Sequence, residues 1–485
     1  MNEPPNASRA HRRRLLALVV AAALFLLVLL SPTPAGLPPA GWRVAAVVVL
    51  MAVLWMTEAV PLAATALLPL VLFPLLGVAT VDTVAAPYAN PLIFLFLGGF
   101  LIALAIERWG LHRRIALNVL QAVGAREDFQ VGGIMLATAA VSMWVSNTAT
   151  TLMMLPVALS IVPRDAGGEV DPERREFAAA LLLAVAYGAS VGGVATLVGT
   201  PPNALFAGFM LQNYGVEIGF GQWMLIGVPV SLAMLAITWL LLTRGRFAVR
   251  RVERPGARAA IRDALAELGP ASSAEKRTAI VFAVTAALWL SRPWLEQGFP
   301  SLSDTSIAIA GALSLFVVPS GLQKGEHLLD WRYAERLPWG VLLLFGGGLT
   351  LASAVADSGL AAWIGDQLTA FDTWPLVVLV AVVVLLITLF SELASNTATA
   401  ATFLPVVAAL ATTVGEDPIR LAVPAALAAS FGFMLPVATP PNAIVFGSGH
   451  VSVGQMLRAG IWLDVLGAGV LIGSVYLLAR PVFGG

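Results

Sequence analysis

Continuous apolar segments, separated by short polar connections, make up most of this chain. A helix needs about 20 mostly apolar residues to cross the hydrocarbon core of a membrane. Segments of about this length fall at 14–31, 43–58, 60–78, 91–107, 177–200, 223–243, 278–295, 305–320, 338–356, 419–438 and 460–479. They lack the alternation of apolar and polar residues that the strands of a transmembrane β-barrel show. The pattern therefore predicts an all-α polytopic membrane protein with about eleven transmembrane helices.

Two further apolar stretches, 131–162 and 375–411, each contain the polar sequence Ser-Asn-Thr. The arm from Val131 to Val145 has about 14 residues and reaches only about 20 Å at 1.5 Å per residue, too short to cross. We therefore expect both stretches to form re-entrant helical hairpins with Ser-Asn-Thr at their tips, where irregular backbone lines a polar cavity. In the alternative interpretation these residues are ordinary helix caps, because Ser, Asn and Thr favour that position.

The composition supports a membrane protein and excludes several chemistries. Of the 485 residues, 59% are hydrophobic and 12% are charged, whereas about 25% of the residues of a soluble domain are charged. Cysteine is absent, which excludes disulfides, a thiol nucleophile and a cysteine metal site. The 28 basic and 28 acidic residues balance, so we expect membrane lipid but no nucleic acid among the partners.

The distribution of basic residues orients the array. Lys and Arg are concentrated before the first span, after the fourth, in 244–277 and after the eighth, whereas 78–91 and 357–374 contain none. Basic loops stay on the cytoplasmic side of a membrane. We therefore expect a multi-pass protein of the cell inner (plasma) membrane, with the N-terminus in the cytoplasm and the C-terminus outside.

The chain also repeats itself. SNTATTLMMLP at 146–156 matches SNTATAATFLP at 395–405, and GTPPNA at 199–204 matches ATPPNA at 438–443. Five predicted spans separate corresponding motifs, and an odd number places the two halves upside-down relative to each other. This pattern predicts inverted five-span repeats, as in secondary transporters. The expected segments are a tail and first helix (1–42), repeat 1 (43–243), a cytoplasmic linker (244–277) and repeat 2 (278–485).

The repeated motifs predict a binding site made of uncharged groups. The paired prolines of each Thr-Pro-Pro-Asn sequence break the fifth and tenth spans and free nearby backbone groups. Helix N-termini that begin at such breaks attract anions, while carbonyl, Ser and Asn oxygens suit a small cation such as sodium. Neither motif contains Lys, Arg or His. We therefore expect a doubly negative solute to bind together with cations.

The paired Ser-Asn-Thr hairpins, each followed by a Pro-Pro-Asn break, resemble those of the divalent anion/sodium symporter family. This family includes bacterial dicarboxylate transporters and animal sodium–carboxylate and sodium–sulfate cotransporters. The similarity runs from Trp55-Met56-Thr57-Glu58-Ala59-Val60-Pro61 to the last span. It implies an eleven-span homodimer that works by an elevator-like displacement. The scaffold would comprise about 14–107 and 278–356, and the moving transport domain about 131–243 and 375–480.

The resemblance also assigns residues. The substrate contacts that it implies are Asn147, Thr148, Thr200, Pro201, Asn396, Thr397, Thr439 and Pro440. Two sodium sites are implied, the first formed by Ser142, Ser146, Asn147 and Gly199, and the second by Ser391, Ala394, Asn396 and Ala438. Where relatives carry Thr, this chain has Ser391 and keeps the hydroxyl group.

The expected function is sodium-coupled symport of C4-dicarboxylates such as succinate, malate or fumarate. Three alternatives stay open: a sodium-independent dicarboxylate exchanger, a tricarboxylate or sulfate symporter of the same family, and a passive anion channel. An enzyme is not expected, because no nucleophile–base pair, aspartate pair or metal motif lies near the tips. Glu392, three residues before Ser395, could neutralise a cation or relay a proton, or could support the tip structurally.

Overall fold

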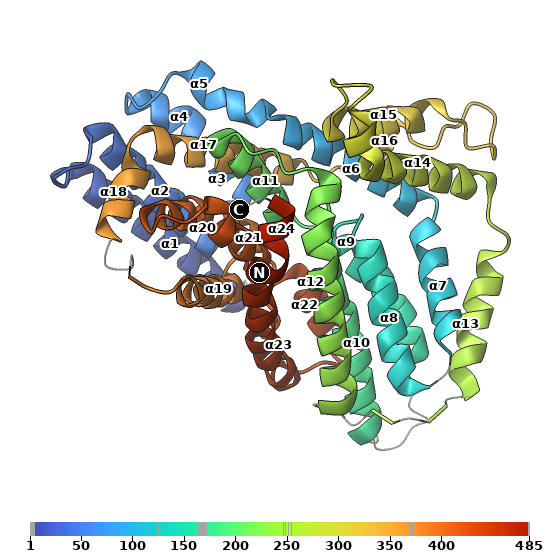
Figure 1. Ribbon diagram of the computed structural model, residues 1–485. Coiled ribbons are helices and arrows are strands. Elements are labelled where there is room, and N and C mark those ends of the chain that lie inside the picture. The colour runs from blue at the N-terminus through green and yellow to red at the C-terminus, as the bar shows by residue number, and fades with distance from the viewer. Residues whose placement is uncertain are drawn as a thin grey trace.

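A computed structural model describes residues 5–124, 126–162, 172–245, 247, 249–250, 252–253, 255–368 and 373–483 (Figure 1). In these ranges the regular elements are helices, with two isolated bridges between Arg126 and Glu253 and between Pro319 and His327. The first half contains α1 (Pro5–Leu30), α2 (Pro39–Thr57), α3 (Leu62–Thr65), α4 (Leu68–Leu75), α5 (Val81–Ala85), η1 (Ala86–Ala89), α6 (Pro91–Arg108), α7 (Leu111–Val123), α8 (Glu127–Ser142), α9 (Asn147–Ile161), α10 (Pro172–Gly193), α11 (Pro201–Tyr214), α12 (Phe220–Leu240) and η2 (Leu241–Gly245).

The second half has corresponding elements after one linker helix. It contains α13 (Pro255–Leu268), α14 (Ser273–Leu295), α15 (Asp304–Val317), α16 (Trp331–Ala334), α17 (Trp339–Asp357), α18 (Leu360–Gln367), α19 (Leu376–Leu393), α20 (Asn396–Thr413), α21 (Pro418–Ala428), α22 (Pro440–Gly447), α23 (Val453–Ser474), η4 (Val475–Ala479) and α24 (Arg480–Phe483). The predicted linker 244–277 thus contains α13, which packs against α7. Parts of this linker and of the predicted N-terminal tail lie outside the described residues.

Nine helical segments in the described part of the chain are long and apolar enough to cross a membrane. They are 12–30, 39–57, 81–108, 174–193, 220–245, 273–295, 339–357, 376–393 and 453–483. The predicted spans 60–78, 305–320 and 419–438 instead form shorter helices, and the first is split between α3 and α4. The length argument for a re-entrant arm applies to α8, with 16 residues. It does not apply to α19, whose 18 mostly apolar residues suffice to cross.

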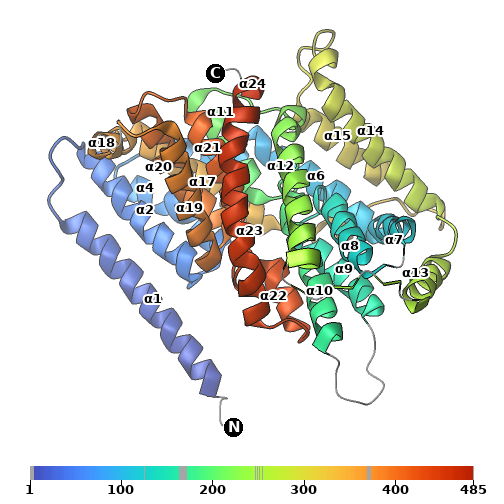
Figure 2. The ribbon, with the colours of Figure 1, turned by 60° about the horizontal axis from the view of Figure 1, so that its bottom comes forward.

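Two runs of helices repeat the same order, α6 to η2 and α17 to η4. In each run a glycine with positive φ, Gly110 or Gly359, ends the first long helix and starts a short one. Each run also closes with a long helix that continues into a π-helical turn. The closing helices α12 and α23 lie side by side and run in opposite directions (Figure 2). This arrangement is that of a duplicated and inverted unit.

The two runs complete each other's core. The helix after the first break, α11, packs against α20 and α21 of the second run. In the reciprocal arrangement, α22 packs against α9 and α10 of the first run. Because every helix that follows a break contacts the opposite repeat, the two breaks are brought together between the repeats.

Small residues allow the closest approaches between helices. An added Cβ at Gly188 would lie 2.8 Å from the carbonyl oxygen of Met135, and one at Gly192 would overlap the backbone of Ala139. The glycine spacing therefore lets α10 lie directly against α8, as small residues do between membrane helices. At the edge of the molecule, α1 packs against α2 and only 6% of its apolar window is buried (Figure 2). The remaining surface of α1 is exposed and available for contact with lipid or another chain.

Candidate substrate and cation site

The two Ser-Asn-Thr sequences begin helices at the tips of the predicted hairpins. Ser146 is the N-cap of α9, and its hydroxyl oxygen accepts a hydrogen bond from the Ala149 amide at 3.3 Å. Ser395 occupies the same position before α20 but makes no side-chain cap. The capping interpretation is therefore correct for Ser146. It does not account for the asparagines, whose side chains turn back toward the preceding helix.

At the first tip, polar atoms from three segments converge on Asn147. One end of its side-chain amide lies 2.7 Å from Ser142 Oγ, 3.1 Å from the carbonyl oxygen of Ala189 and 3.3 Å from that of Gly199. Ser142 Oγ is itself 2.8 Å from the Ala189 carbonyl oxygen. Nitrogen at this end satisfies the contacts, because the amide then donates to Ser142 Oγ and to both carbonyl oxygens. With the amide turned over, its oxygen would join the hydroxyl and carbonyl oxygens in a set that suits a hard cation. The residue types present, with hydroxyl, amide and carbonyl oxygens, are those that a sodium ion accepts as ligands.

The second tip repeats this geometry. Ser391 Oγ lies 2.9 Å from Asn396 Oδ1 and 2.7 Å from the carbonyl oxygen of Ala429. Ser391, Asn396 and Ala429 correspond in the other repeat to Ser142, Asn147 and Ala189. Ala438 also lies close by, since an added Cβ at Gly432 would be 3.2 Å from Ala438 Cβ and 3.4 Å from the Ser391 carbonyl oxygen. Each repeat thus supplies one oxygen-rich set built from the same residue types.

Both Thr-Pro-Pro-Asn sequences break helices, as predicted. Helix α10 ends at Gly193 and α11 begins at Pro201, while α21 ends at Ala428 and α22 begins at Pro440. The prolines occupy the first turn of the new helix, where a missing N–H group leaves no hydrogen bond unmade. Between these ends the backbone is unwound, and its polar groups need other partners.

The asparagines of these motifs hold the unwound segments. Asn203 Nδ2 lies 3.4, 3.1 and 2.7 Å from the carbonyl oxygens of Gly193, Val194 and Thr196. Asn442 Nδ2 donates at 3.0 Å to the carbonyl oxygens of Gly432 and Leu435. Both asparagines are fully buried. Their side chains satisfy backbone acceptors that have lost their helical partners.

Further contacts fix the second unwound segment. The carboxylate of Glu392 accepts hydrogen bonds from the Met434 amide at 2.8 Å and the Leu435 amide at 2.9 Å. From the first repeat, the hydroxyl group of Tyr187 donates to the Phe433 carbonyl oxygen at 2.9 Å. These contacts support the structural interpretation of Glu392, because its carboxylate holds the backbone beside the tip.

The predicted site residues differ in exposure. Asn147 and Asn396 are half-buried and Thr148 is exposed, whereas its counterpart Thr397 is buried. Thr200, Thr439, Gly199, Ala394 and Ala438 are buried, Pro201 is half-buried and Pro440 is exposed. The structure brings Ser142, Asn147 and Gly199 together, and likewise Ser391 and Asn396. Ser146 serves as a cap, and Thr439 Oγ1 accepts from the Asn442 amide at 3.3 Å.

Asn203 and Asn442, whose side chains bind the unwound segments, were not identified from the sequence. Ser430, which contacts the other repeat, was also not identified from it. Ser430 Oγ lies 3.5 Å from Thr200 Oγ1, and both side chains are buried. A signal for this position was present, because ASVGG at 189–193 and ASFGF at 429–433 are a further repeated motif. In both copies the alanine carbonyl contacts the serine hydroxyl of the preceding hairpin.

A duplicated, inverted helical membrane protein whose broken helices meet between its repeats belongs to the class of secondary transporters. The family model described as the sodium:sulfate symporter transmembrane region matches residues 12–483. The chain therefore belongs to the sodium:sulfate symporter family, which confirms the resemblance drawn from the motifs.

The relatives agree with this class, and two solved structures share the fold. The chain is 40% identical over 479 residues to the sodium-dependent dicarboxylate transporter SdcS of Staphylococcus aureus strain USA300, covering 97% of this chain and 92% of that protein. The same transporter from strain bovine RF122 is 41% identical over the same shares. The fold is similar to MtrF of Neisseria gonorrhoeae, with a TM-score of 0.59, 13% identity and 100% and 97% of the two chains covered. It is also similar to YdaH of Alcanivorax borkumensis, with a TM-score of 0.55, 15% identity and 98% of each chain covered.

Proposed function

We propose that this protein is a secondary active transporter that couples the uptake of C4-dicarboxylates, such as succinate, malate or fumarate, to sodium. The observation that carries the proposal is the twin oxygen set, Ser142 with Asn147 and Ser391 with Asn396, at two tips beside two broken helices. The names of the relatives, sodium-dependent dicarboxylate transporters at 40% identity over nearly the full length, support the substrate and the ion.

The two oxygen sets suit sodium, and the tips suit a dianion. Ser142, Ser146, Asn147 and Gly199 would bind one sodium ion, and Ser391, Ala394, Asn396 and Ala438 the other, using hydroxyl, amide and carbonyl oxygens. Cations at these positions would offset the charge of a dianion in a site without basic side chains. Asn147, Thr148, Asn396 and Thr397 lie at the starts of α9 and α20, where free N–H groups and the helix dipoles favour a carboxylate.

The remaining substrate contacts are assigned to the breaks. Thr200 and Pro201 begin α11, and Thr439 and Pro440 begin α22, so each pair places a further helix N-terminus beside a tip. Contacts of this kind would orient the two carboxylates of the substrate without a charged side chain of the protein. Because pocket size also selects the substrate, sulfate and tricarboxylates are the competitors to test.

The proposed mechanism is an elevator-like movement within a homodimer of the inner membrane. The regions 131–243 and 375–480 would move as the transport domain against 14–107 and 278–356. The close reciprocal packing of α11 with α20 and α21, and of α22 with α9 and α10, favours movement of both tips as one body. We expect the N-terminus in the cytoplasm and the C-terminus outside, in agreement with the basic loops.

Uptake into proteoliposomes tests the proposal directly. The full chain would be reconstituted and supplied with radiolabelled succinate, with or without an inward sodium gradient, and with succinate, citrate or sulfate as competitors. We expect sodium-dependent uptake that unlabelled succinate inhibits most strongly. Uptake that ignores the sodium gradient but requires internal dicarboxylate would replace the proposal with exchange. Stronger inhibition by citrate or sulfate would correct the substrate, and flux far above carrier turnover would indicate a channel.

A further inference from the structure

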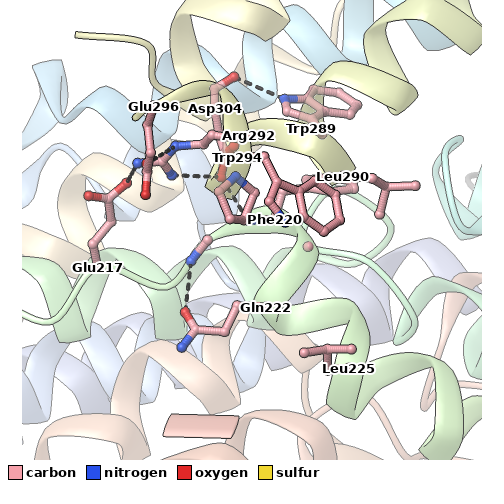
Figure 3. A pocket seen from close by; sticks show the side chains of 13 residues that line it. Glu217, Phe220, Gln222, Leu225, Trp289, Leu290, Arg292, Trp294, Glu296 and Asp304 are labelled. Atoms are coloured by element: carbon pink, nitrogen blue, oxygen red, sulfur yellow. Dashed lines mark hydrogen bonds and ion pairs between the residues drawn. The ribbon is translucent and has the colours of Figure 1, made fainter. Parts of the chain in front are cut away.

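A cavity of about 720 Å³ lies where the ends of three helices meet (Figure 3). Its lining comes from the first turns of α12, the last turns of α14 and the start of α15. Helix α12 begins at this cavity and α14 ends there. Because both helices are long enough to span the membrane, the cavity lies at the level of one membrane surface. The adjoining loops, 215–219 and 296–303, contain no Lys or Arg, which favours the outer surface.

One side of this cavity is apolar and open to the surroundings. Trp294 is 72% exposed, Leu225 60% and Leu290 47%, and all three line the cavity. Leu290 and Trp294 belong to α14, whose apolar window is only 17% buried, and Leu225 lies on α12. In a membrane this apolar side meets acyl chains, and tryptophan at such a level is typical of the interface between hydrocarbon and headgroups.

The opposite side of the cavity is charged. The guanidinium group of Arg292 lies 2.7 Å from a Glu217 carboxylate oxygen, 3.3 Å from Asp304 and 3.4 Å from Glu296 (Figure 3). Asp304 is buried and accepts the Phe220 amide at 2.7 Å. The side chains of Glu217 and Glu296 are 56% and 45% exposed. One guanidinium therefore faces three carboxylates, two of which stay accessible, and the cluster has an excess of negative charge.

The geometry points to a binding site for an amine-bearing phospholipid of the surrounding bilayer, with its ammonium group between Glu217 and Glu296. An ammonium group offers three N–H donors for these carboxylates, whereas a choline headgroup offers none. The lipid phosphate would lie beside Arg292, and an acyl chain along Trp294, Leu225 and Leu290. An anionic headgroup is disfavoured by the negative excess, and a soluble amine would leave the apolar side unused.

Stacked rings connect this cavity to the first tip. Phe220 and Trp289, both in the cavity lining, stack at 4.3 Å between ring centroids. Trp144, two residues before Ser146, stacks on Phe220 at 5.9 Å and on Trp289 at 6.5 Å. The cavity lining and the residues before the first tip therefore belong to one packed aromatic cluster.

Lipid binding to the purified full-length protein tests the site without any assumption about transport. The protein in detergent would be titrated with dioleoyl-phosphatidylethanolamine, dioleoyl-phosphatidylcholine or dioleoyl-phosphatidylglycerol, and bound lipid counted by native mass spectrometry. We expect the ethanolamine lipid to bind about five- to tenfold more tightly than the choline lipid, as two half-exposed ion pairs allow. The double variant Glu217→Gln/Glu296→Gln should lose this preference.

Two further variants, a control carboxylate on another helix and a change on the apolar side of the cavity, separate loss of this site from a general loss of lipid binding. Glu267→Gln removes another exposed carboxylate, on α13, and should keep the wild-type preference. Leu225→Arg changes the apolar side and should weaken binding of the ethanolamine lipid. Equal binding of the ethanolamine and choline lipids, tightest binding of the glycerol lipid, or an unchanged preference in the double variant would overturn the proposal.

Discussion

The hydroxyl groups of Thr200 and Ser430, which come from different repeats, lie 3.5 Å apart in the buried region between the two breaks. Thr200 precedes the first proline of α11. Ser430 follows Ala429, whose carbonyl oxygen contacts Ser391 of the second oxygen set. The first break and the second oxygen set are therefore connected through two adjacent residues, Ser430 and Ala429. In the proposed transporter, this contact would couple a solute at the break to an ion at the tip.

Removing the hydroxyl group of Ser391 should weaken sodium binding. In Ser391→Ala the second oxygen set loses one ligand, and the Asn396 amide and Ala429 carbonyl lose their shared partner. A lost polar contact at a buried site costs about 1–3 kcal/mol, or roughly 5- to 150-fold in affinity. The sodium concentration for half-maximal succinate uptake should rise accordingly.

Ser448→Ala is the matched control for this experiment. Ser448 follows α22, and its hydroxyl group bonds to the Val445 carbonyl oxygen of the same helix. Its sodium dependence should stay at the wild-type value. Wild-type sodium dependence in Ser391→Ala would place the cation elsewhere.

The buried asparagines of the two breaks should be required for stability. In Asn203→Ala, carbonyl oxygens of the first unwound segment lose their donor, and Asn442→Ala does the same in the second. Each change should lower the free energy of unfolding by about 1–3 kcal/mol. Asn203→Asp should be no better than alanine, because a carboxylate has no N–H group. Thermal unfolding of the purified protein measures the effect.

Asn213→Ala provides the comparison on the same helix. Asn213 lies at the end of α11, where its side chain bonds only to the Phe209 carbonyl oxygen one turn earlier. Its loss should change stability by much less. Equal losses of stability in Asn213→Ala and Asn203→Ala would mean that the contacts of Asn203 with the unwound segment do not stabilise the fold more than an ordinary helix-end contact.

A methyl group at Gly193 should disturb the first oxygen set. An added Cβ would overlap the Asn147 side-chain amide and lie 3.0 Å from the Gly199 carbonyl oxygen. Because the Gly199 oxygen belongs to the backbone and the Asn147 amide to a side chain, the amide has to move, and we expect sodium affinity to fall by at least about tenfold. Gly454→Ala on α23, where a Cβ meets nothing within 4 Å, should keep wild-type affinity. Sodium titration of succinate uptake distinguishes the two outcomes.

His112 should make the protein less stable in acid. It is buried at the start of α7, and this burial lowers the pKa of its imidazole below the usual 6.5, although the Ile106 carbonyl partly opposes the shift. The unfolded chain then binds the proton more readily than the folded chain. The contribution of the neutral imidazole to stability is complete above pH 6.5 and is lost as the pH falls from there toward the lower folded pKa.

The variant His112→Gln should flatten this part of the stability profile. Unfolding midpoints between pH 8 and pH 5 would be compared for wild type, His112→Gln and the exposed-site control His327→Gln. We expect the wild type and the control to lose stability in parallel toward acid, and the His112 variant to lose less. A His112→Gln profile parallel to the wild type would contradict this assignment.

Motifs in the sequence were sufficient to locate the tips and the breaks. Apolar runs, paired prolines and repeated Ser-Asn-Thr are local signals, and the helices end and begin where these signals lie. The Ser142–Asn147 and Ser391–Asn396 contacts were also accessible, since the resemblance placed both members of each pair in one site. The assignment of these residues to sodium and substrate stays a prediction.

Other features depend on the path of the chain in three dimensions. The partners of Asn203 lie between Gly193 and Thr196, and only the shape of the unwound segment brings them to its side chain. The Arg292 cluster joins residues from two loops and two helices that no motif connects. Length alone does not decide the course of α19, because 18 mostly apolar residues fit either a full crossing or a deep hairpin arm.

The reciprocal packing of α11 and α22 bears on how such a chain arose. Neither repeat has a complete core, because the helix after each break is covered by the other repeat. A half-length ancestor could have formed this core only by pairing with a copy inserted in the opposite direction. Gene fusion would then have fixed both directions in one polypeptide, in which corresponding residues such as Thr148 and Thr397 differ in exposure.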